Sequence, residues 1–305
     1  MAIGEFRFTP FSHDSYGLVE SIRVNPLTGA VSWVDIEAGD HVTVWENQRE
    51  YEDAFQVRPN LSFAEPLTQG GFIFAAGQQL GCVDEQGKMF LSGPLLTSAR
   101  RFNDGAIDAL GRLIIGSMNF GPSDGNNVLI VFEQDGEPTV LDSDLGLSNG
   151  IAVSPETGGF FSVDTLAGVI FHRELDHSSG RYEDRRIFHR FSQGEHPDGI
   201  TLLQTGHLVV ALWGGSGLAI IDQDGQEVQR VAVPPVFATS VCIAPETGVL
   251  FVGGASQPRE GRVTPHAAGG VWSSQSPLNG YPLSSWAQES TPGSIVSSGS
   301  GKVIA

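Results

Sequence analysis

The sequence has few cysteines and few lysines, and each shortage argues against a class of protein. Only two cysteines, Cys82 and Cys242, occur in 305 residues, far apart and outside any CxxC motif. A disulfide framework or a thiolate metal site is therefore not expected. Only two lysines, Lys88 and Lys302, are present, and the formal net charge is −18. Without a basic run to neutralise phosphates, neither a nucleic acid nor an anionic membrane surface is an expected partner.

Long apolar segments are also missing. No stretch approaches the roughly 20 apolar residues that a membrane helix needs. Residues 1–21 lack the basic start and apolar centre of a signal peptide. We therefore expect a soluble, cytoplasmic protein. No HExxH, P-loop or GxGxxG pattern points to a further cofactor.

Turn-forming residues, in contrast, are abundant along the chain. It contains 39 glycines and 17 prolines, with 40% hydrophobic and 17% charged residues. This composition is typical of a globular protein built from many short strands joined by tight turns. The segment 290–305 is rich in Ser and Gly, and we expect it to be a loose C-terminal tail.

A repeat of 41 to 48 residues dominates the sequence. Six short apolar runs mark it, each too short for a helix and each with glycine nearby. A repeat of roughly 40–50 residues is the length of one four-stranded propeller blade. The runs are Val31–Asp35, Phe72–Ala76, Leu113–Ser117, Phe160–Asp164, Leu208–Leu212 and Leu250–Gly254.

A recurrent turn supports the same repeat. The pattern Pro-x-Thr-Gly occurs at Pro26–Gly29, Pro155–Gly158 and Pro245–Gly248, each time five residues before the next apolar run. Proline presets a turn and glycine supplies its left-handed position. A β-sandwich with regular hairpins is the alternative, but its strands would recur singly. The sequence therefore predicts an all-β fold, a six-bladed β-propeller of four-stranded antiparallel blades around a central channel, in one domain over residues 1–289.

Polar residues recur just before the innermost strand of five blades. They stand 10 or 11 residues before the following apolar run, so they should converge on one mouth of the channel: Glu20, Asn103, Asn149, Asp198 and Ser240. Blade two offers only Leu61 or Ser62. Such an oxygen-only set suits a hard divalent cation such as Ca²⁺, Mg²⁺ or Mn²⁺, and Zn²⁺ or Fe²⁺ could also bind. The alternative is that Asn-Gly and Asp-Gly are ordinary turn dipeptides, as we expect for Asp135-Gly136 and Asp224-Gly225.

An ordered series of short segments resembles the successive signatures of the senescence-marker-protein/gluconolactonase/luciferin-regenerating-enzyme family. The resemblance covers roughly residues 15 to 285, and its segments are Arg101–Gly105, Gly111–Met118, Ser148–Gly150, Phe161–Thr165, Pro197–Gly199 and Thr239–Ser240. It implies a six-bladed propeller with one divalent metal ion in the channel. By this resemblance Glu20, Asn149 and Asp198 are the metal ligands, and Arg101 and Asn103 contact the substrate.

The sequence departs from the family pattern in two places. Leu18–Ile22 replaces a Gly-Glu-Gly-Pro-like motif around the first ligand. Asn119 and Phe120 follow Gly-Ser-Met where many members carry a substrate-contacting acid, so a sugar lactone need not be the substrate. Two other motifs remain open: Gly121–Gly125 has the spacing of a nucleophile elbow, which would require a helix after it, and His196 could reach the pocket.

The predicted function is the metal-dependent hydrolysis of a small lactone. The metal would polarise the carbonyl, and Asp198 would accept a proton from the attacking water. Arg101 would bind oxygen atoms of the substrate. A phosphotriester or fluorophosphate hydrolase using the same metal is one alternative, and a non-catalytic ligand-binding propeller is another.

Overall fold

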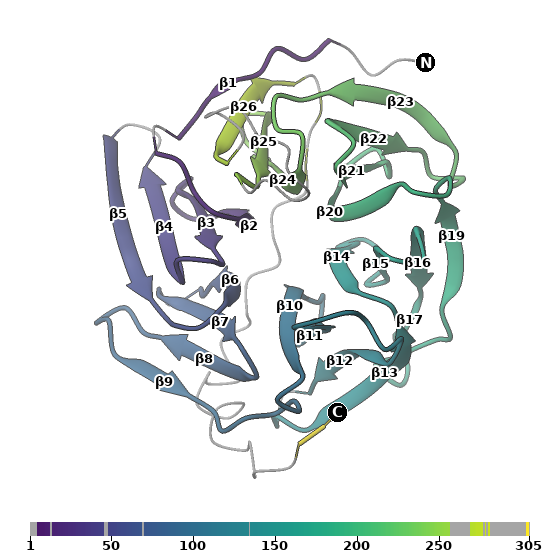
Figure 1. The fold of residues 1–305 in the computed structure, drawn as a ribbon. Helices are drawn as coiled ribbons and strands as arrows, with labels where there is room; N and C mark the ends of the chain where they lie inside the picture. Colours follow the sequence, from purple (N-terminus) through teal and green to yellow (C-terminus); the bar gives the residue numbers. More distant parts are fainter. Residues whose placement is uncertain are drawn as a thin grey trace.

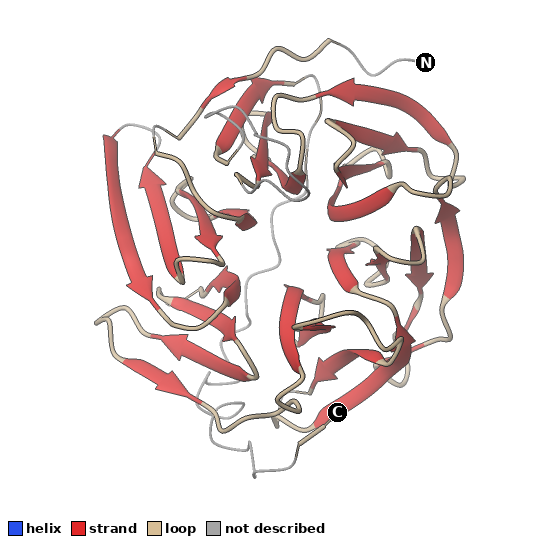
Figure 2. Ribbon diagram, in the orientation of Figure 1, coloured by secondary structure: helices blue, strands red, loops and turns tan. Residues whose placement is uncertain are grey.

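The structure, a computed structural model, is a ring of six antiparallel sheets around a central axis (Figure 1). It describes residues 5–12, 14–45, 48–68, 70–133, 135–256, 269–276, 278, 280 and 303–304, with the backbone alone for 48–54. The described residues contain strands and turns but no helix (Figure 2), so none of them forms a helix able to cross a membrane. The predicted six-bladed, four-stranded propeller is confirmed.

Blades one to three each use four consecutive strands, ordered from the axis outward. Blade one holds β2 (Val19–Val24), β3 (Val31–Asp35), β4 (Asp40–Trp45) and β5 (Gln48–Gln56). Blade two holds β6 (Leu61–Pro66), β7 (Phe72–Ala76), β8 (Gln79–Val83) and β9 (Met89–Leu91). Blade three holds β10 (Arg100–Ile107), β11 (Leu113–Asn119), β12 (Asn127–Phe132) and β13 (Pro138–Leu145).

Blades four and five follow the same plan with one insertion. Blade four holds β14 (Ser148–Val153), β15 (Phe160–Asp164), β16 (Val169–Arg173) and β19 (Arg186–Arg190). Between its last two strands lies the hairpin of β17 (Leu175–Asp176) and β18 (Arg181–Tyr182). Blade five holds β20 (His196–Leu202), β21 (Leu208–Trp213), β22 (Gly217–Ile221) and β23 (Glu227–Ala232).

Blade six joins the two ends of the propeller. It combines β24 (Ala238–Ile243), β25 (Val249–Gly254) and β26 (Val271–Gln275) with β1 (Thr9–Pro10) as its outermost strand. Thr9 lies opposite Ser273 in this pairing. This strand, which precedes blade one in the chain, therefore ties the first blade to the last and closes the ring.

Each predicted apolar run is the second strand of its blade, namely β3, β7, β11, β15, β21 and β25. The predicted Pro-x-Thr-Gly turns join the first and second strands of blades one, four and six. In each the glycine N–H donates to the carbonyl four residues earlier, and Gly29, Gly158 and Gly248 have φ of 72°, 70° and 67°. Glycine reaches that region without strain, which explains why the turn recurs.

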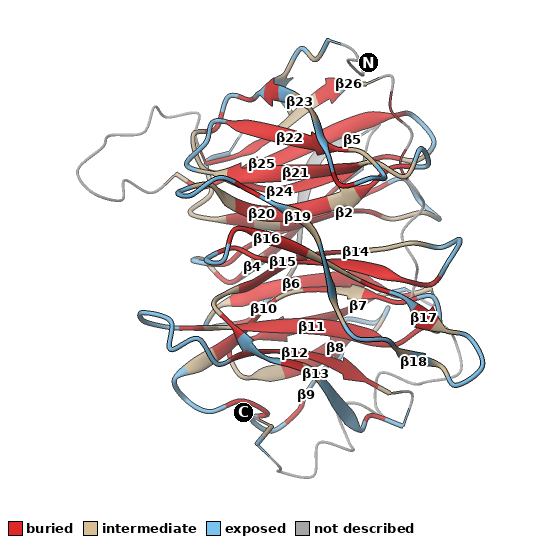
Figure 3. Ribbon diagram, turned by 90° about the vertical axis from the view of Figure 1, so that its right-hand side faces the viewer, coloured by how far each residue is buried: buried red, intermediate tan, exposed pale blue. Residues whose placement is uncertain are grey.

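The hydrophobic core is divided among the interfaces between neighbouring blades. Both faces of the second and third strands are buried there, and the exposed residues gather at the turns and on the outermost strands (Figure 3). One cluster joins Phe63 and Phe102 across blades two and three, and Ile304 packs against it. The Ile304 N–H donates to the carbonyl of Leu95 at 2.7 Å. The rest of the predicted loose tail, 290–302 and 305, lies outside the described residues.

His41 is a buried base within the interface between blades one and two. Its ring lies 4.6 Å from the ring of Phe55 and 4.1 Å from that of Phe72 by centroids, and neither ring nitrogen has a hydrogen-bond partner. Burial lowers the pKa of His41 from 6.5 to about 3. The folded protein therefore holds this imidazole in its neutral form.

This histidine should make the protein sensitive to acid. Below pH 6.5 the histidine binds a proton in the unfolded chain but stays neutral in the folded protein. The free energy of unfolding therefore falls as the pH drops from about 6.5 to about 3, by up to about 1.4 kcal/mol per pH unit. His41→Phe should flatten this part of the pH profile of denaturant unfolding. Phe72→Leu is the matched control, since it should lower stability at every pH and keep the slope. An unchanged slope in His41→Phe would assign the acid sensitivity to other groups.

Candidate active site

The innermost strands of all six blades carry an irregularity where they reach the channel mouth. In β14 the antiparallel register shifts between Ser148 and Ile151, so Asn149 and Gly150 together oppose one residue of β15. In β20 the shift falls between Pro197 and Ile200. The other four inner strands show equivalent shifts. Bulges of this kind redirect side chains and commonly lie beside functional sites.

The glycines after Asn149 and Asp198 are required by close approach of the backbones. A Cβ atom at Gly150 would lie 2.5 Å from the carbonyl oxygen of Asp198, and one at Gly199 would lie 2.7 Å from that of Thr239. Neighbouring inner strands thus touch at these positions. The Asn-Gly and Asp-Gly pairs are consequently not hairpin turns, whereas Gly136 and Gly225, with φ of 85° and 77°, belong to turns at the outer strands.

Glu20 comes to this mouth from β2, where it lies opposite Val34. The next residue, Ser21, has a left-handed φ of 51°. Burial raises the pKa of the Glu20 carboxyl well above its usual value, and the charges of Asp198 and Asp104 raise it further, while Arg101 lowers it. Charged side chains from blades three and five therefore lie close enough to Glu20 of blade one to influence its ionisation.

Asp198 is the most deeply buried carboxylate of the group, with 4% of the residue exposed. Burial, followed by the charge of Asp104, raises the pKa of Asp198 well above its usual value, and a hydrogen bond from the Asn149 side chain opposes this rise. Its Oδ1 atom is buried and has no hydrogen-bond partner. An orphaned buried oxygen is costly, so a ligand or ion that satisfied it would be favoured.

Thr165 fixes the orientation of Asn149. The Thr165 hydroxyl donates to the carbonyl oxygen of Pro197 at 2.7 Å and accepts from Asn149 Nδ2 at 3.2 Å. The hydroxyl has only one proton, which it gives to Pro197, so toward Asn149 it can only accept a hydrogen bond. The amide nitrogen of Asn149, and not the amide oxygen, must therefore face Thr165. The Asn149 Oδ1 atom is thereby left available in the channel. Sequence reasoning gave Thr165 no role, because it lies 16 residues from Asn149, in the turn after β15.

Substitution of Thr165 should test this orientation. Thr165→Val keeps the shape of the side chain but releases the Asn149 amide, so metal affinity should fall about 10-fold or more, as for other groups that orient ligands. Thr165→Ser restores the hydroxyl and should restore the affinity. Calorimetric titration of divalent metal into both variants checks this, with thermal unfolding of the apo proteins as the measure of the fold. Equal affinity for Val and wild type would refute the orienting role.

Arg101 and Asn103 form a connected pair on β10. Arg101 Nη1 donates to Asn103 Oδ1 at 2.8 Å and to the carbonyl of Phe102 at 2.9 Å, and Asn103 Nδ2 donates to the carbonyl of Ser148 at 2.9 Å. Burial lowers the pKa of Arg101 to about 10, although Glu20 and Asp198 oppose this shift. The guanidinium is therefore still charged at neutral pH, and Asn103 holds it in place.

A second layer of charge lies beneath the mouth, and sequence analysis missed it. Arg23 Nε lies 2.6 Å from Glu65 Oε2, and Arg23 Nη2 lies 3.4 Å from Asp104 Oδ1 and 2.8 Å from the carbonyl of Gly105. Burial raises the pKa of Asp104 and of Glu65, and Arg23 opposes both shifts. The sequence does offer one indication of this network: Arg23, Glu65 and Asp104 are charged residues within inner strands that are otherwise mostly apolar.

Ser240 and Ser62 link neighbouring blades. Ser240 Oγ accepts the backbone N–H of Ile22 at 3.0 Å, and Ser62 Oγ donates to the carbonyl of Phe102 at 3.0 Å. Both hydroxyls therefore join one inner strand to the next. Ser240 was expected to add its oxygen to the channel-mouth cluster, but its hydroxyl oxygen accepts a hydrogen bond from blade one instead.

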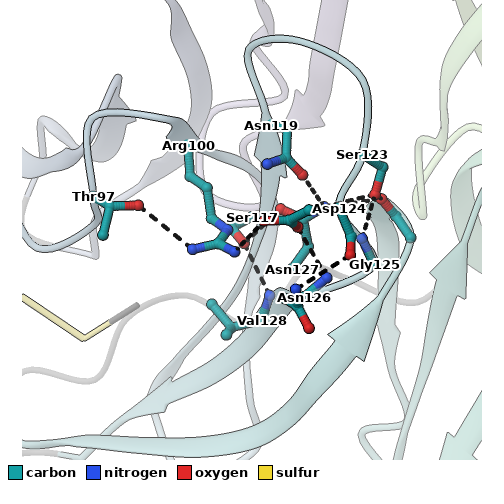
Figure 4. Close-up of polar contacts among 11 residues, drawn as sticks. Thr97, Arg100, Ser117, Asn119, Ser123, Asp124, Gly125, Asn126, Asn127 and Val128 are labelled. Atoms are coloured by element: carbon teal, nitrogen blue, oxygen red, sulfur yellow. Dashed lines mark hydrogen bonds and ion pairs between the residues drawn. The ribbon is translucent and has the colours of Figure 1, made fainter.

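Several side-chain hydrogen bonds and an ion pair hold the loop after β11 (Figure 4). Asn127 Nδ2 donates to Asn119 Oδ1 at 2.8 Å and to the carbonyl of Gly146 at 2.9 Å. Arg100 pairs with Asp124 at 2.9 Å. The side-chain amide oxygen of Asn119 thus helps to hold the loop together. Near this position many family members carry an acid.

The same loop excludes the nucleophile-elbow reading of Gly121–Gly125. Ser123 Oγ donates its proton to the carbonyl of Gly146 at 2.5 Å. No helix follows the serine, because the chain enters β12 at Asn127. A hydroxyl bound to a carbonyl and without a neighbouring base is not an activated nucleophile.

The oxygen atoms at the channel mouth fit a divalent cation. Among the described residues, no three His, Cys, Asp or Glu side chains gather closely enough to hold a metal by themselves. The set formed by Glu20, Asn149 and Asp198 includes a carboxamide, an orphaned carboxylate oxygen and two carboxyls whose pKa values are raised by burial and by the negative charges of neighbouring carboxylates. A cation would relieve that repulsion, and hard divalent ions prefer such ligands.

These features define a class of protein: six-bladed propellers with a buried site of carboxylates, carboxamide and arginine at one mouth of the channel. A family model described as the SMP-30/Gluconolactonase/LRE-like region matches residues 18–256. The chain therefore belongs to this family, as the ordered signatures indicated.

Similar proteins of known sequence and structure agree with this assignment. The chain is 29% identical over 226 residues to the pentonolactonase XacC of Haloferax volcanii, covering 72% of this chain and 75% of the relative. Its fold matches a luciferin-regenerating enzyme with a TM-score of 0.85 at 19% identity, over 93% and 100% of the two chains. It also matches a calcium-binding protein, regucalcin, from Agrobacterium tumefaciens with a TM-score of 0.84 at 20% identity, over 93% and 98%.

Proposed function

We propose that this protein is a metal-dependent lactonase, which opens the ring of a small lactone by attack of water. The observation that carries the proposal is the convergence of Glu20, Asp198 and Arg101, from three blades, around an orphaned carboxylate oxygen. The kinship with the pentonolactonase supports the same chemistry. A lactone substrate requires both a cation site for its carbonyl and a base for water, and this constellation offers groups for each.

The metal ligands in this proposal are Glu20, Asn149 and Asp198. A bound divalent cation would supply Lewis-acid polarisation of the carbonyl. Glu20 and Asp198 contribute the negative charge that retains a cation. Asn149 contributes a neutral oxygen, which its bond to Thr165 aims into the channel. The match to a calcium-binding structure supports a divalent ion, and Ca²⁺, Zn²⁺, Mg²⁺, Mn²⁺ and Fe²⁺ remain candidates.

The protein groups divide the remaining tasks. Asp198 accepts a proton from water, for which its buried position beside Asn149 prepares it. Arg101 binds oxygen atoms of the substrate with donors that Asn103 holds in place. Arg101, Asn103 and Asp198 are 7%, 7% and 4% exposed, and this burial keeps bulk water away, which strengthens each electrostatic interaction.

Both cysteines are free and buried, which supports the proposed cytoplasmic location. Burial raises the pKa of each thiol to about 11, so neither is an expected nucleophile or metal ligand.

A panel of substrates tests the function. Proton release from aldono-lactones and from simple γ- and δ-lactones should be seen in the metal-loaded protein at a pH-stat. A phosphotriester and a fluorophosphate belong in the same panel, because the same site could polarise a P=O bond. Turnover of phosphorus esters alone would replace the proposal with that alternative. Binding without turnover of any ester would leave a ligand-binding propeller.

A further inference from the structure

The channel beneath the mouth contains an ion pair in largely apolar surroundings. A cavity of about 70 Å³ lies there, lined by the inner strands of all six blades. Arg23 and Glu65 line it among mostly aliphatic residues, and they are 8% and 2% exposed. A buried ion pair seldom stabilises a fold more than apolar side chains of similar volume would. Its presence here therefore favours a specific task for the pair.

The guanidinium of Arg23 connects blades one, two and three. Arg23 belongs to β2 of blade one, and its Nη1 atom donates to the carbonyl of Ile22 at 3.1 Å. Its Nε atom donates to Glu65 Oε2, on β6, at 2.6 Å. Its Nη2 atom donates to the carbonyl of Gly105, on β10, at 2.8 Å and lies 3.4 Å from Asp104 Oδ1. Because the guanidinium is planar and rigid, these contacts fix this part of β10 relative to blades one and two.

The segment of β10 that Arg23 contacts lacks regular support from its own sheet. The register of β10 against β11 shifts just before Gly105, so Asn103 and Asp104 fall outside the regular pairing. Contacts from other blades replace it. Asn103 Nδ2 donates to the carbonyl of Ser148 in blade four at 2.9 Å, while Arg23 holds the two residues that follow. The Gly105 N–H donates at 2.8 Å to the same Asp104 oxygen that faces Arg23.

We propose that Arg23 is a positioning residue for substrate binding: it holds the β10 bulge from beneath and so keeps Arg101 and Asn103 in the geometry that receives the substrate. The inference rests on the proposed lactonase function. Arg101 Nη1 donates to Asn103 Oδ1 at 2.8 Å, so a shift of the bulge moves both members of the pair. Small displacements of groups that position a substrate weaken its binding.

Arg23→Lys tests this role, because lysine keeps the charge but does not reproduce the planar fork that joins Glu65 to Gly105. KM for γ-butyrolactone should rise about 10-fold or more, as for other groups that orient a binding residue. kcat should change by less than about 3-fold, because Arg101 binds the substrate in the ground state as well as in the transition state. Should Arg23→Lys not fold, the double variant Arg23→Met/Glu65→Met removes both charges of the pair and should show the same rise in KM.

Arg112→Lys is the matched control. Arg112 is similarly buried, its Nε atom lies 2.7 Å from Asp108 Oδ2, and its Nη1 atom donates to the carbonyl of Gly180 at 2.8 Å. It lies in the turn between β10 and β11, at the end of β10 away from Arg101. Its replacement should lower Tm about as much as Arg23→Lys does and leave KM unchanged. Thermal unfolding of both variants measures the cost to the fold.

Hydrogen exchange separates failure of this inference from failure of the proposed function, because it needs neither substrate nor turnover. By NMR, the Gly105 N–H should exchange about 10-fold or more faster in Arg23→Lys than in wild type, since its acceptor Asp104 loses an anchor. Arg112→Lys should leave this exchange rate unchanged.

Faster exchange at Gly105 in Arg23→Lys, combined with a wild type that hydrolyses no lactone, would remove the lactonase proposal and keep Arg23 as the anchor of the bulge. An unchanged exchange rate at Gly105 would overturn the positioning role. An unchanged KM in an active Arg23→Lys protein, or an equal rise of KM in Arg112→Lys, would overturn it as well, because Arg23 would then serve the fold alone.

Discussion

Asp198→Asn should lower kcat by about 100-fold or more without lowering the thermal stability of the metal-free protein. The substitution removes the proposed proton acceptor and one negative charge from the metal ligands, and such roles are each worth about 10²-fold. Stability should stay the same or rise, because the raised pKa of Asp198 means that the fold disfavours its charge beside Asp104. A variant that loses activity but keeps an equal or higher Tm indicates that the replaced group serves function at the expense of stability.

Asp224→Asn provides the control for this measurement. Asp224 is also followed by glycine and lies in the same blade, but it is exposed in the turn between β22 and β23. Its replacement makes the same change in charge and should leave kcat unaltered. A folded, metal-loaded Asp198→Asn protein that kept nearly full activity would require the base to be assigned to another residue.

Removal of divalent metal should abolish lactone hydrolysis, and adding metal back should restore it. The buried carboxyls of Glu20 and Asp198, with their raised pKa values, form a site whose repulsion a cation relieves. The apo protein should also unfold at a lower temperature than the metal-loaded protein, because a ligand that binds only the folded state stabilises it. Equal rates before and after complete metal removal would contradict the metal-dependent mechanism.

Glu20→Gln tests whether this one residue contributes to the binding of the metal. An amide oxygen lacks the charge that favours a hard cation, so calorimetric titration should give a metal affinity about 10-fold or more weaker than that of wild type. Glu137→Gln, at an exposed position before β13, makes the same chemical change away from the channel and should leave the affinity unchanged. Identical affinities for Glu20→Gln and wild type would mean that blade one contributes no ligand through this side chain.

The spacing argument placed Asn149 and Asp198 at corresponding positions of blades four and five. In the structure a hydrogen bond from the Asn149 side chain lowers the pKa of the Asp198 carboxyl, while the metal-binding role of both residues stays a prediction. Ser240 has nearly the same spacing, yet its hydroxyl holds the Ile22 N–H. The spacing along the chain predicts which residues reach the channel axis. Contacts with the neighbouring inner strand determine whether their side chains can still bind a ligand there.

The amino-acid sequence by itself determined the blade repeat, the Pro-x-Thr-Gly turns and the ring of positions around the channel, because these depend on residues close together in the chain. Only the tertiary structure decided which groups act together there. The orientation of Asn149 depends on Thr165, and the charge beneath the mouth depends on Arg23 and Glu65. These partners lie 16 to 42 residues apart and meet only when strands and blades pack into the ring, so no local pattern records their contact.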